Sequence, residues 1–246
     1  MSTQMIPAQR FTTQLRVETR KLLDTRGGLA VIGLVIATCL FALIWLVSQS
    51  KYPPTFHRYS TGVANIVAFL IPVVTLMAMT AEWTQRTALT TFTMSPRRGR
   101  VLTAKFLAGL AVSTAVLVTV LLLAAATTGL GGLIHGDASW ELMGSDIRTY
   151  FIIMFLEVVM AAAFAALAGH TAVALVAYFI FPSAWAAFAS NVLGRTGEWF
   201  DIFAAYDRLS SSHPFDSLGK TLTSVGCWIA VPAVLGIRRS LHREIK

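Results

Sequence analysis

The stretch LAVIGLVIATCLFALIWLVS (residues 29–48) holds 20 consecutive residues without a charged side chain. At about 1.5 Å per residue, a helix of this length covers about 30 Å, which is the thickness of the hydrocarbon core of a bilayer. Five further apolar runs follow, at residues 63–81, 106–128, 150–169, 171–192 and 222–237. The sequence therefore predicts an all-α polytopic membrane protein, with six transmembrane helices in one transmembrane domain that covers residues 1–246.

The composition supports this fold class. Only 13% of the residues are charged and 55% are hydrophobic, whereas a soluble domain carries about 25% charged residues. The net charge of +8 comes largely from bases that flank the apolar runs. Because such bases set the orientation of membrane helices, we interpret them as topological signals and do not expect a nucleic-acid partner.

The fourth and fifth apolar runs almost merge. One helix over residues 150–192 would be about 65 Å long, twice the hydrocarbon thickness. The only polar, helix-weakening position near its middle is Gly169-His170-Thr171. We therefore predict a tight hairpin there.

Counting basic residues predicts the orientation. With both termini in the cytoplasm, the cytoplasmic segments hold 14 Lys and Arg residues and the external segments hold 6. This bias agrees with the positive-inside rule. We expect a multi-pass protein of a bacterial plasma membrane, with a surface helix at residues 10–26 before the first span and an external segment at residues 194–220 that includes an interfacial helix.

The longest cytoplasmic loop is AEWTQRTALTTFTMSPRRGRVLTAK (residues 81–105), between the second and third spans. It begins with one acid, Glu82, and continues with bases only. In the predicted surface helix, Phe11, Leu15 and Leu22 share one face, and Glu18 interrupts that face. Both segments are expected at the cytoplasmic membrane surface.

Motifs for catalysis are absent from the sequence. Gly219-Lys220-Thr221 resembles the end of a phosphate loop, but the glycine required five positions before Gly219 is Pro214. We expect no catalytic residues, no metal site and no cofactor in this chain. The single acid deep within a span is Glu157, which either lines a pathway for a cationic substrate or proton, or makes a structural hydrogen bond.

Three motifs suggest a family. The first is Glu18-Thr19-Arg20-Lys21-Leu22-Leu23-Asp24-Thr25-Arg26, ahead of the first span. The second is the long loop, with Glu82, Trp83 and Thr87, then Pro96-Arg97-Arg98-Gly99-Arg100 and Ala104-Lys105. The third is Gly169-His170-Thr171-Ala172. With its six-span pattern, the chain resembles the integral-membrane permease subunits of ATP-binding-cassette (ABC) transporters of the type-2 exporter class, in particular small actinobacterial permeases; Arg86 departs from the glycine common in that family.

This resemblance implies an efflux mechanism driven by a partner. Two permeases, identical or sister chains, would pair in the bilayer, and each would dock on a cytoplasmic nucleotide-binding ATPase that carries ATP and Mg²⁺. Residues 82–100 would form the coupling loop, with a coupling helix against the ATPase. The residues implied in coupling are Glu82, Trp83, Arg86, Thr87, Leu89 and Phe92. The residues expected to anchor the chain to the membrane surface are Glu18, Lys21, Arg26, Arg97, Arg98, Arg100 and Lys105.

Two other functions remain open from the sequence. The chain could be a stand-alone secondary transporter that uses Glu157, or a membrane scaffold or sensor subunit without transport. No internal repeat relates residues 1–128 to residues 129–246, although such repeats are common in secondary transporters.

Overall fold

The structure is a computed structural model that describes residues 10–49, 52–84, 98–136, 138–141, 144–211 and 213–242. Within these ranges the chain is helical and contains no strand, apart from an isolated bridge between Thr55 and Ser139. Six helical segments are long and apolar enough to cross a membrane. They are Arg26–Ser48, Phe56–Glu82, Gly99–Ile134, Asp146–Ala168, Thr171–Phe200 and Leu218–Arg239. The predicted fold class, an all-α multi-pass membrane protein, is confirmed.

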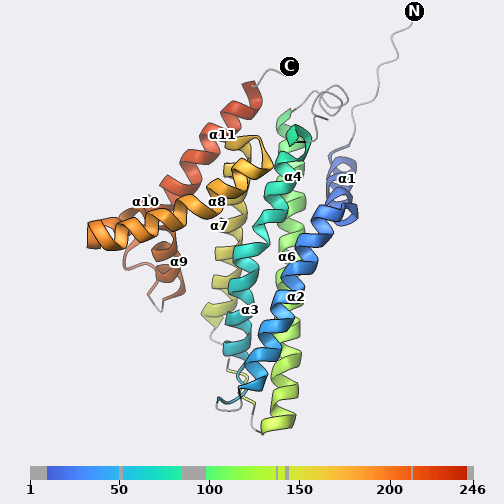
Figure 1. Cartoon of the computed structure of the whole chain (residues 1–246), viewed down its shortest axis with the longest axis vertical. Helices are drawn as coiled ribbons and strands as arrows, with labels where there is room; N and C mark the ends of the chain where they lie inside the picture. Colours follow the sequence, from blue (N-terminus) through green and yellow to red (C-terminus); the bar gives the residue numbers. More distant parts are fainter. Residues whose placement is uncertain are drawn as a thin grey trace, which may run out of the picture.

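The described chain up to residue 168 contains the three longest helices, α2, α6 and α7, together with three shorter ones. These elements are α1 (Phe11–Asp24), α2 (Arg26–Ser48), α3 (Phe56–Leu70), α4 (Pro72–Thr84), α6 (Arg98–His135) and α7 (Gly144–Ala168). Figure 1 shows α2, α3, α4, α6 and α7 side by side along the long axis, with α1 packed across one end. The end of α4 and the start of α6 lie at that same end (Figure 1).

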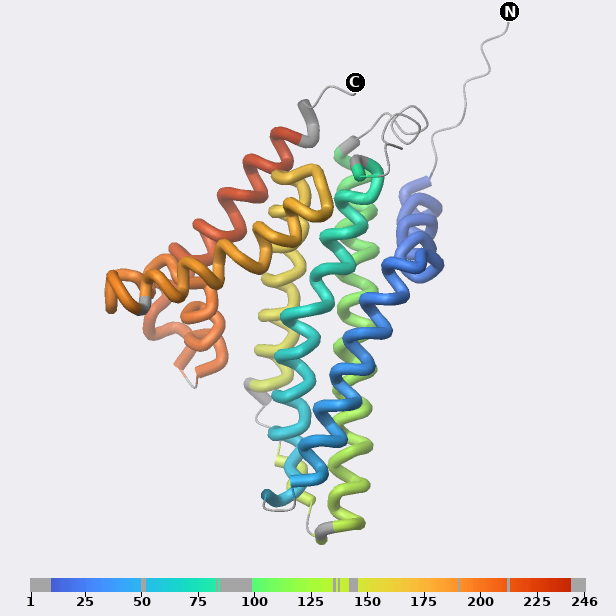
Figure 2. The backbone as a smooth tube through the Cα atoms, in the orientation of Figure 1, coloured from blue at the N-terminus to red at the C-terminus, as the bar shows by residue number. Residues whose placement is uncertain are grey.

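The second half of the chain departs from this bundle. It contains α8 (Thr171–Phe188), the π-helical η1 (Ala189–Leu193), the 3-10 helix η2 (Gly194–Phe200), α9 (Ile202–Ser210), α10 (Leu218–Val225), the π-helical η3 (Gly226–Ala230) and α11 (Val231–His242). The tube in Figure 2 shows α8 leaving the bundle obliquely, and α11 returning to the end where α1 lies. Two apolar cores share α4 and α7: the first joins them to α2, α3 and α6, and the second joins them to α8 and α9.

Local chemistry explains several helix boundaries. Thr25 separates α1 from α2, and its hydroxyl accepts a hydrogen bond from the amide of Gly28 at 3.2 Å, which caps α2. A side chain on Gly28 would place Cβ 2.0 Å from the carbonyl oxygen of Leu22, so only glycine fits this corner. Pro72 begins α4 directly after α3, because proline cannot donate the amide hydrogen bond that would continue α3 unbroken.

The turn between α7 and α8 falls at the sequence position where we expected a hairpin. Gly169 has φ of +64°, a left-handed conformation that glycine adopts without strain, and its amide donates to the carbonyl of Ala165 at 2.9 Å. The third span differs from our expectation of residues 106–128, because α6 begins at Arg98 and has 38 residues. The residues from Arg98 to Lys105 are therefore helical and do not form the second half of a loop.

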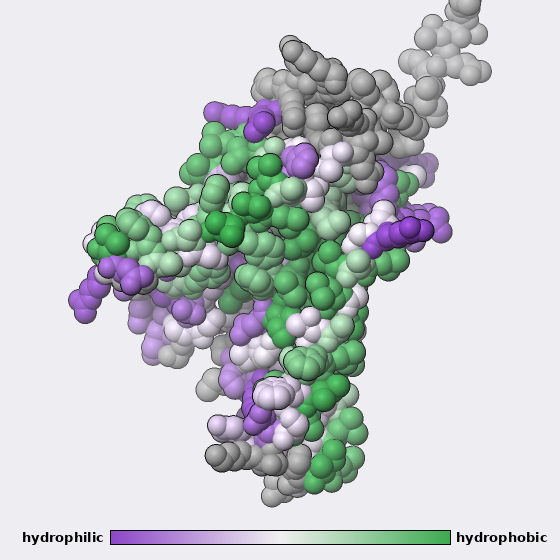
Figure 3. Space-filling model, viewed as in Figure 1, coloured by the Kyte–Doolittle hydropathy of each residue, from purple (hydrophilic) through white to green (hydrophobic). Residues whose placement is uncertain are grey.

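The surface matches the environment of a membrane protein. Figure 3 shows hydrophobic residues over α8 and over the middle of α2 and α4, with hydrophilic residues at α1 and at the end of α11. Large apolar side chains of α2 are exposed on its outer face, among them Phe41, Ile44 and Trp45. In water such a surface would be unfavourable, whereas in a bilayer it faces lipid.

Helix α7 packs against α3, α4, α6, α8 and α11 and so lies at the centre of the fold. Its C-terminal end, AAAFAALA (residues 161–168), is made mostly of alanine, which lets neighbouring backbones approach closely. Gly236 of α11 uses this space, since a Cβ there would lie 2.8 Å from the amide nitrogen of Leu167 and 3.0 Å from the carbonyl oxygen of Ala163.

We predict that Gly236→Val destabilises the protein by about 1–3 kcal/mol, because overpacking against the backbone of α7 forces α11 outward. The matched control is Gly33→Val in α2, where an added Cβ meets nothing within 4 Å. Thermal unfolding in detergent, followed by tryptophan fluorescence, should show a lower midpoint for the first variant only. Equal midpoints for both variants would mean that α11 does not need this close approach.

Candidate functional site

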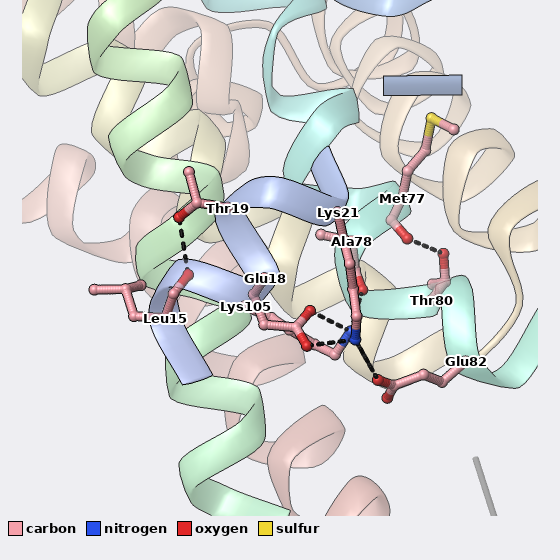
Figure 4. A network of polar contacts seen from close by, with 9 residues as sticks. All are labelled: Leu15, Glu18, Thr19, Lys21, Met77, Ala78, Thr80, Glu82 and Lys105. Atoms are coloured by element: carbon pink, nitrogen blue, oxygen red, sulfur yellow. Dashed lines mark hydrogen bonds and ion pairs between the residues drawn. The ribbon is translucent and has the colours of Figure 1, made fainter. Parts of the chain in front are cut away.

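A buried ion-pair cluster lies at the end of the bundle where α4 ends and α6 begins. Lys105 of α6 is 2% exposed, and its Nζ atom lies 3.1 Å from Glu18 Oε2 of α1 and 3.1 Å from Glu82 Oε1 of α4. Figure 4 shows both carboxylates pointing toward this region from their separate helices. One ammonium group thus joins α6 to α4 and to α1, which lies far from both in the sequence.

The two carboxylates are held differently. Lys105 donates hydrogen bonds to Glu18 and, at 2.9 Å, to the carbonyl oxygen of Ala78. The contact to Glu82 Oε1 is an ion pair that lacks hydrogen-bond alignment, although this oxygen is buried. Lys21 lies at the edge of the cluster, 2.7 Å from Glu18 and 3.9 Å from Glu82, with its side chain 49% exposed. Glu82 is therefore the more weakly held of the two acids.

The formal charges of the cluster balance, since two lysines face two glutamates. Balance matters because an uncompensated charge away from water is strongly unfavourable. A cavity of about 340 Å³ adjoins the cluster and is lined in part by Lys21, Met77 and Lys105. The ion pairs therefore have free space beside them in which the side chains can rearrange.

The same end of α4 is also tied to α8. The hydroxyl of Thr171, the first residue of α8, lies 2.8 Å from that of Thr80 and 2.9 Å from that of Thr84. The amide of Thr171 donates to Thr84 Oγ1 at 3.3 Å, so a side chain of α4 satisfies one of the free amides at the start of α8. The last turn of α4 is consequently connected to α1, α6 and α8.

The structure brings together four of the residues singled out from the sequence, namely Glu18, Lys21, Glu82 and Lys105. Glu18 and Lys105, which we expected to anchor the chain at the membrane surface, are both buried within the protein. The apolar face of α1 packs against α6, so Glu18 meets Lys105 there, and this explains why an acid interrupts that face.

The other predicted residues are elsewhere. Arg26 is exposed at the start of α2, Arg98 is the first residue of α6, and the guanidinium of Arg100 lies 5.8 Å from the centre of the Phe11 ring. Trp83 belongs to the last turn of α4, and its side chain lies outside the part of the chain that the structure describes. Also outside the described residues are Arg86, Thr87, Leu89, Phe92 and Arg97.

Glu157 forms a second buried polar group, in the middle of α7. Its residue is 5% exposed, and Tyr178 of α8 donates a short hydrogen bond to its Oε2 atom. The buried hydroxyl of Tyr206 in α9 also faces this carboxylate, without hydrogen-bond geometry. Glu157 therefore connects α7 with α8 and lies beside α9, and in this conformation two tyrosines enclose it.

Sequence reasoning missed Thr80, Thr84, Tyr178 and Tyr206. The two threonines are four residues apart and so share one helix face, which was visible in the sequence. Their partner on α8, Thr171, was not visible in the sequence. It lies 91 positions after Thr80 and 87 positions after Thr84, and only the fold brings these residues into contact.

We predict that Lys105→Met destabilises the protein by about 3–5 kcal/mol, since it leaves two buried carboxylates with only the half-exposed Lys21 to compensate them. The triple variant Glu18→Gln/Glu82→Gln/Lys105→Met should recover a large part of this loss, because no buried charge remains. Lys21→Met serves as the control and should cost about 1 kcal/mol or less, because Lys21 is half exposed. Thermal unfolding midpoints of the purified variants measure all three effects, and equal losses at Lys21 and Lys105 would contradict the buried cluster.

We further predict that Tyr178→Phe costs about 1–3 kcal/mol, because the carboxylate of Glu157 loses its hydrogen-bond donor while it stays buried. Tyr52→Phe removes an exposed hydroxyl and should be neutral. Adding Glu157→Gln to Tyr178→Phe should reduce the loss, since a neutral amide tolerates burial better than a carboxylate. An unchanged midpoint for Tyr178→Phe would show that this bond adds nothing to stability.

No family model matches the chain, and no curated protein matches it.

Proposed function

We propose that the chain is the permease subunit of an ATP-driven exporter in a bacterial plasma membrane. In this proposal residues 82–100 receive force from a separate cytoplasmic ATPase, and both termini lie in the cytoplasm. The observation that supports it best is the buried cluster of Glu18, Glu82 and Lys105. The resemblance of the sequence motifs to type-2 ABC permeases gives the proposal its specific form.

The cluster has the properties that a force-transmitting contact requires. Residues 85–97 are bounded by α4 and α6, and the ion pairs join the end of α4 to the third turn of α6 and to α1. The threonine contacts extend the connection to α8. A displacement of the loop would therefore move four helices together, and α8 is one of the helices that leave the bundle (Figure 1).

The weaker contact to Glu82 suits a switch between two arrangements. If the ATPase moves the loop, Glu82 can separate from Lys105 while Glu18 and Ala78 still hold the ammonium group. Lys21 lies 3.9 Å from Glu82, so it can take over the carboxylate at the exposed edge of the cluster. Two lysines within 3.9 Å thus offer Glu82 two alternative ion pairs, as a two-state element needs.

The first test is co-purification of the tagged chain from its native membranes. We expect a nucleotide-binding subunit to accompany it in stoichiometric amount, together with a second permease chain. Isolation of a stable single-component protein whose transport activity ignores ATP would overturn the proposal.

We predict that Glu82→Lys uncouples the complex: the ATPase stays bound and hydrolyses ATP, but the permease no longer responds. Cys227 offers a reporter, because it is exposed in η3 whereas Cys39 is buried. A fluorophore on Cys227 should change its emission on ATP addition in the wild-type complex. This change should be lost in Glu82→Lys and kept in Glu141→Lys, which reverses an exposed acid in the segment before α7.

A further inference from the structure

Glu157 is a buried acid that the proposed coupling mechanism does not use. It lies in the middle of α7, and the helices α7, α8 and α9 all contact one another. Tyr178 of α8 is 3% exposed and Tyr206 of α9 is 7% exposed, so both side chains that face Glu157 are as buried as the acid itself. An ionisable group deep within a span is energetically costly and usually serves a function.

The carboxylate of Glu157 has no positively charged partner among the described residues. The titratable side chains that face it are Tyr178 and Tyr206, whereas α3, α4, α6, α11 and η3, which also pack on α7, bring no charged side chain to it. A carboxylate without a counter-ion is strongly unfavourable in apolar surroundings, even when phenols donate to it. In the ion cluster, by contrast, an ammonium group faces each glutamate. The site around Glu157 is therefore suited to binding a positive charge.

The surroundings of Glu157 suit a proton and no larger cation. Both tyrosines belong to the second apolar core, in which Met160, Ala161 and Ile202 are also buried. Cations such as Ca²⁺ and Mg²⁺ take about six oxygen ligands, whereas one carboxylate and two phenols meet here. The described residues also hold no group of three or more acidic, histidine or cysteine side chains that could bind a metal. A proton needs only one oxygen.

The hydroxyl of Tyr206 offers a partner for that proton. It is buried and faces Glu157, but it has no hydrogen bond. Tyr178 already donates to Oε2 of Glu157, so the unprotonated carboxylate is held from α8 alone. A protonated carboxyl group has an O–H donor of its own, and a small rotation of either side chain lets this donor reach the oxygen of Tyr206. Proton uptake can therefore add a bond from α7 to α9 while the bond to α8 persists.

We propose that Glu157 is a proton-binding site, in which the bound proton is donated in a hydrogen bond to Tyr206 and ties α9 to α7. The proton comes from water, one O–H bond forms at the carboxylate, and no covalent bond of the protein breaks. Helix α9 has nine residues, whereas α7 has 25 and α8 has 18, so α9 is the element that the added bond restrains most. Proton binding at this site does not depend on a partner ATPase.

The test is infrared difference spectroscopy of the purified full chain in nanodiscs, between about pH 8 and about pH 6. Exposed aspartates and glutamates stay ionised over this range and contribute little. We expect the wild type to gain the carbonyl band of a protonated carboxylic acid at the lower pH. Glu157→Gln should lack this band, whereas Glu141→Gln, which changes an exposed acid, should keep it.

Two tyrosine variants distinguish the proton site from a packing contact. Tyr178→Phe removes a bond to the unprotonated carboxylate and should raise the ratio of protonated to unprotonated protein at a fixed pH by about fivefold. Tyr206→Phe removes the acceptor of the protonated form and should lower this ratio by a similar factor. These opposite shifts decide the question even where Glu157→Gln does not fold. A wild type without the band, a band that persists in folded Glu157→Gln, or tyrosine variants that shift the ratio in the same direction would overturn the proposal.

Discussion

The contact between Lys105 and two acids is the constraint on which one end of this molecule depends. An ammonium group that is 2% exposed needs compensation, and here Glu18 and Glu82 provide it from different helices. Meeting this requirement fixes the register of α1, α4 and α6 relative to one another. Apolar side chains alone would leave that register less defined, because apolar contacts have no direction.

The centre of the fold depends on close packing between helices rather than on ion pairs. Helix α7 approaches its neighbours closely because residues 161–168 are mostly alanine, and Gly236 lets α11 approach it further. In a bilayer, close packing and internal hydrogen bonds replace the hydrophobic effect as the force between helices. The hydrogen bond from Tyr178 to Glu157 is one of these internal hydrogen bonds, because it gives a buried carboxylate a donor on the neighbouring helix.

Much of the fold was predictable from the sequence, because length and apolarity determine which segments can cross a bilayer. The turn at Gly169 could be located because two spans need a reversal between them. The ion cluster could be predicted only in part. Glu18 stood out as an acid on an apolar face, but its partner Lys105 is 87 positions away, and the basic run before Lys105 resembled a surface loop. Whether a base near the end of a span is buried or exposed depends on tertiary packing, which local sequence does not encode.

The break at Pro72 has a consequence for motion. The second span consists of α3 and α4, and Pro72 begins α4 without an amide to donate back to α3. Val63 and Val67 of α3 are buried in the first apolar core, and α4 contributes to both cores, with Val74 and Ala78 in the first and Leu76 and Met79 in the second. The span is therefore interrupted just before the helix that contacts both cores. A change of angle at Pro72 would alter the position of Glu82 relative to α3, because no amide of residue 72 holds the two helices together there.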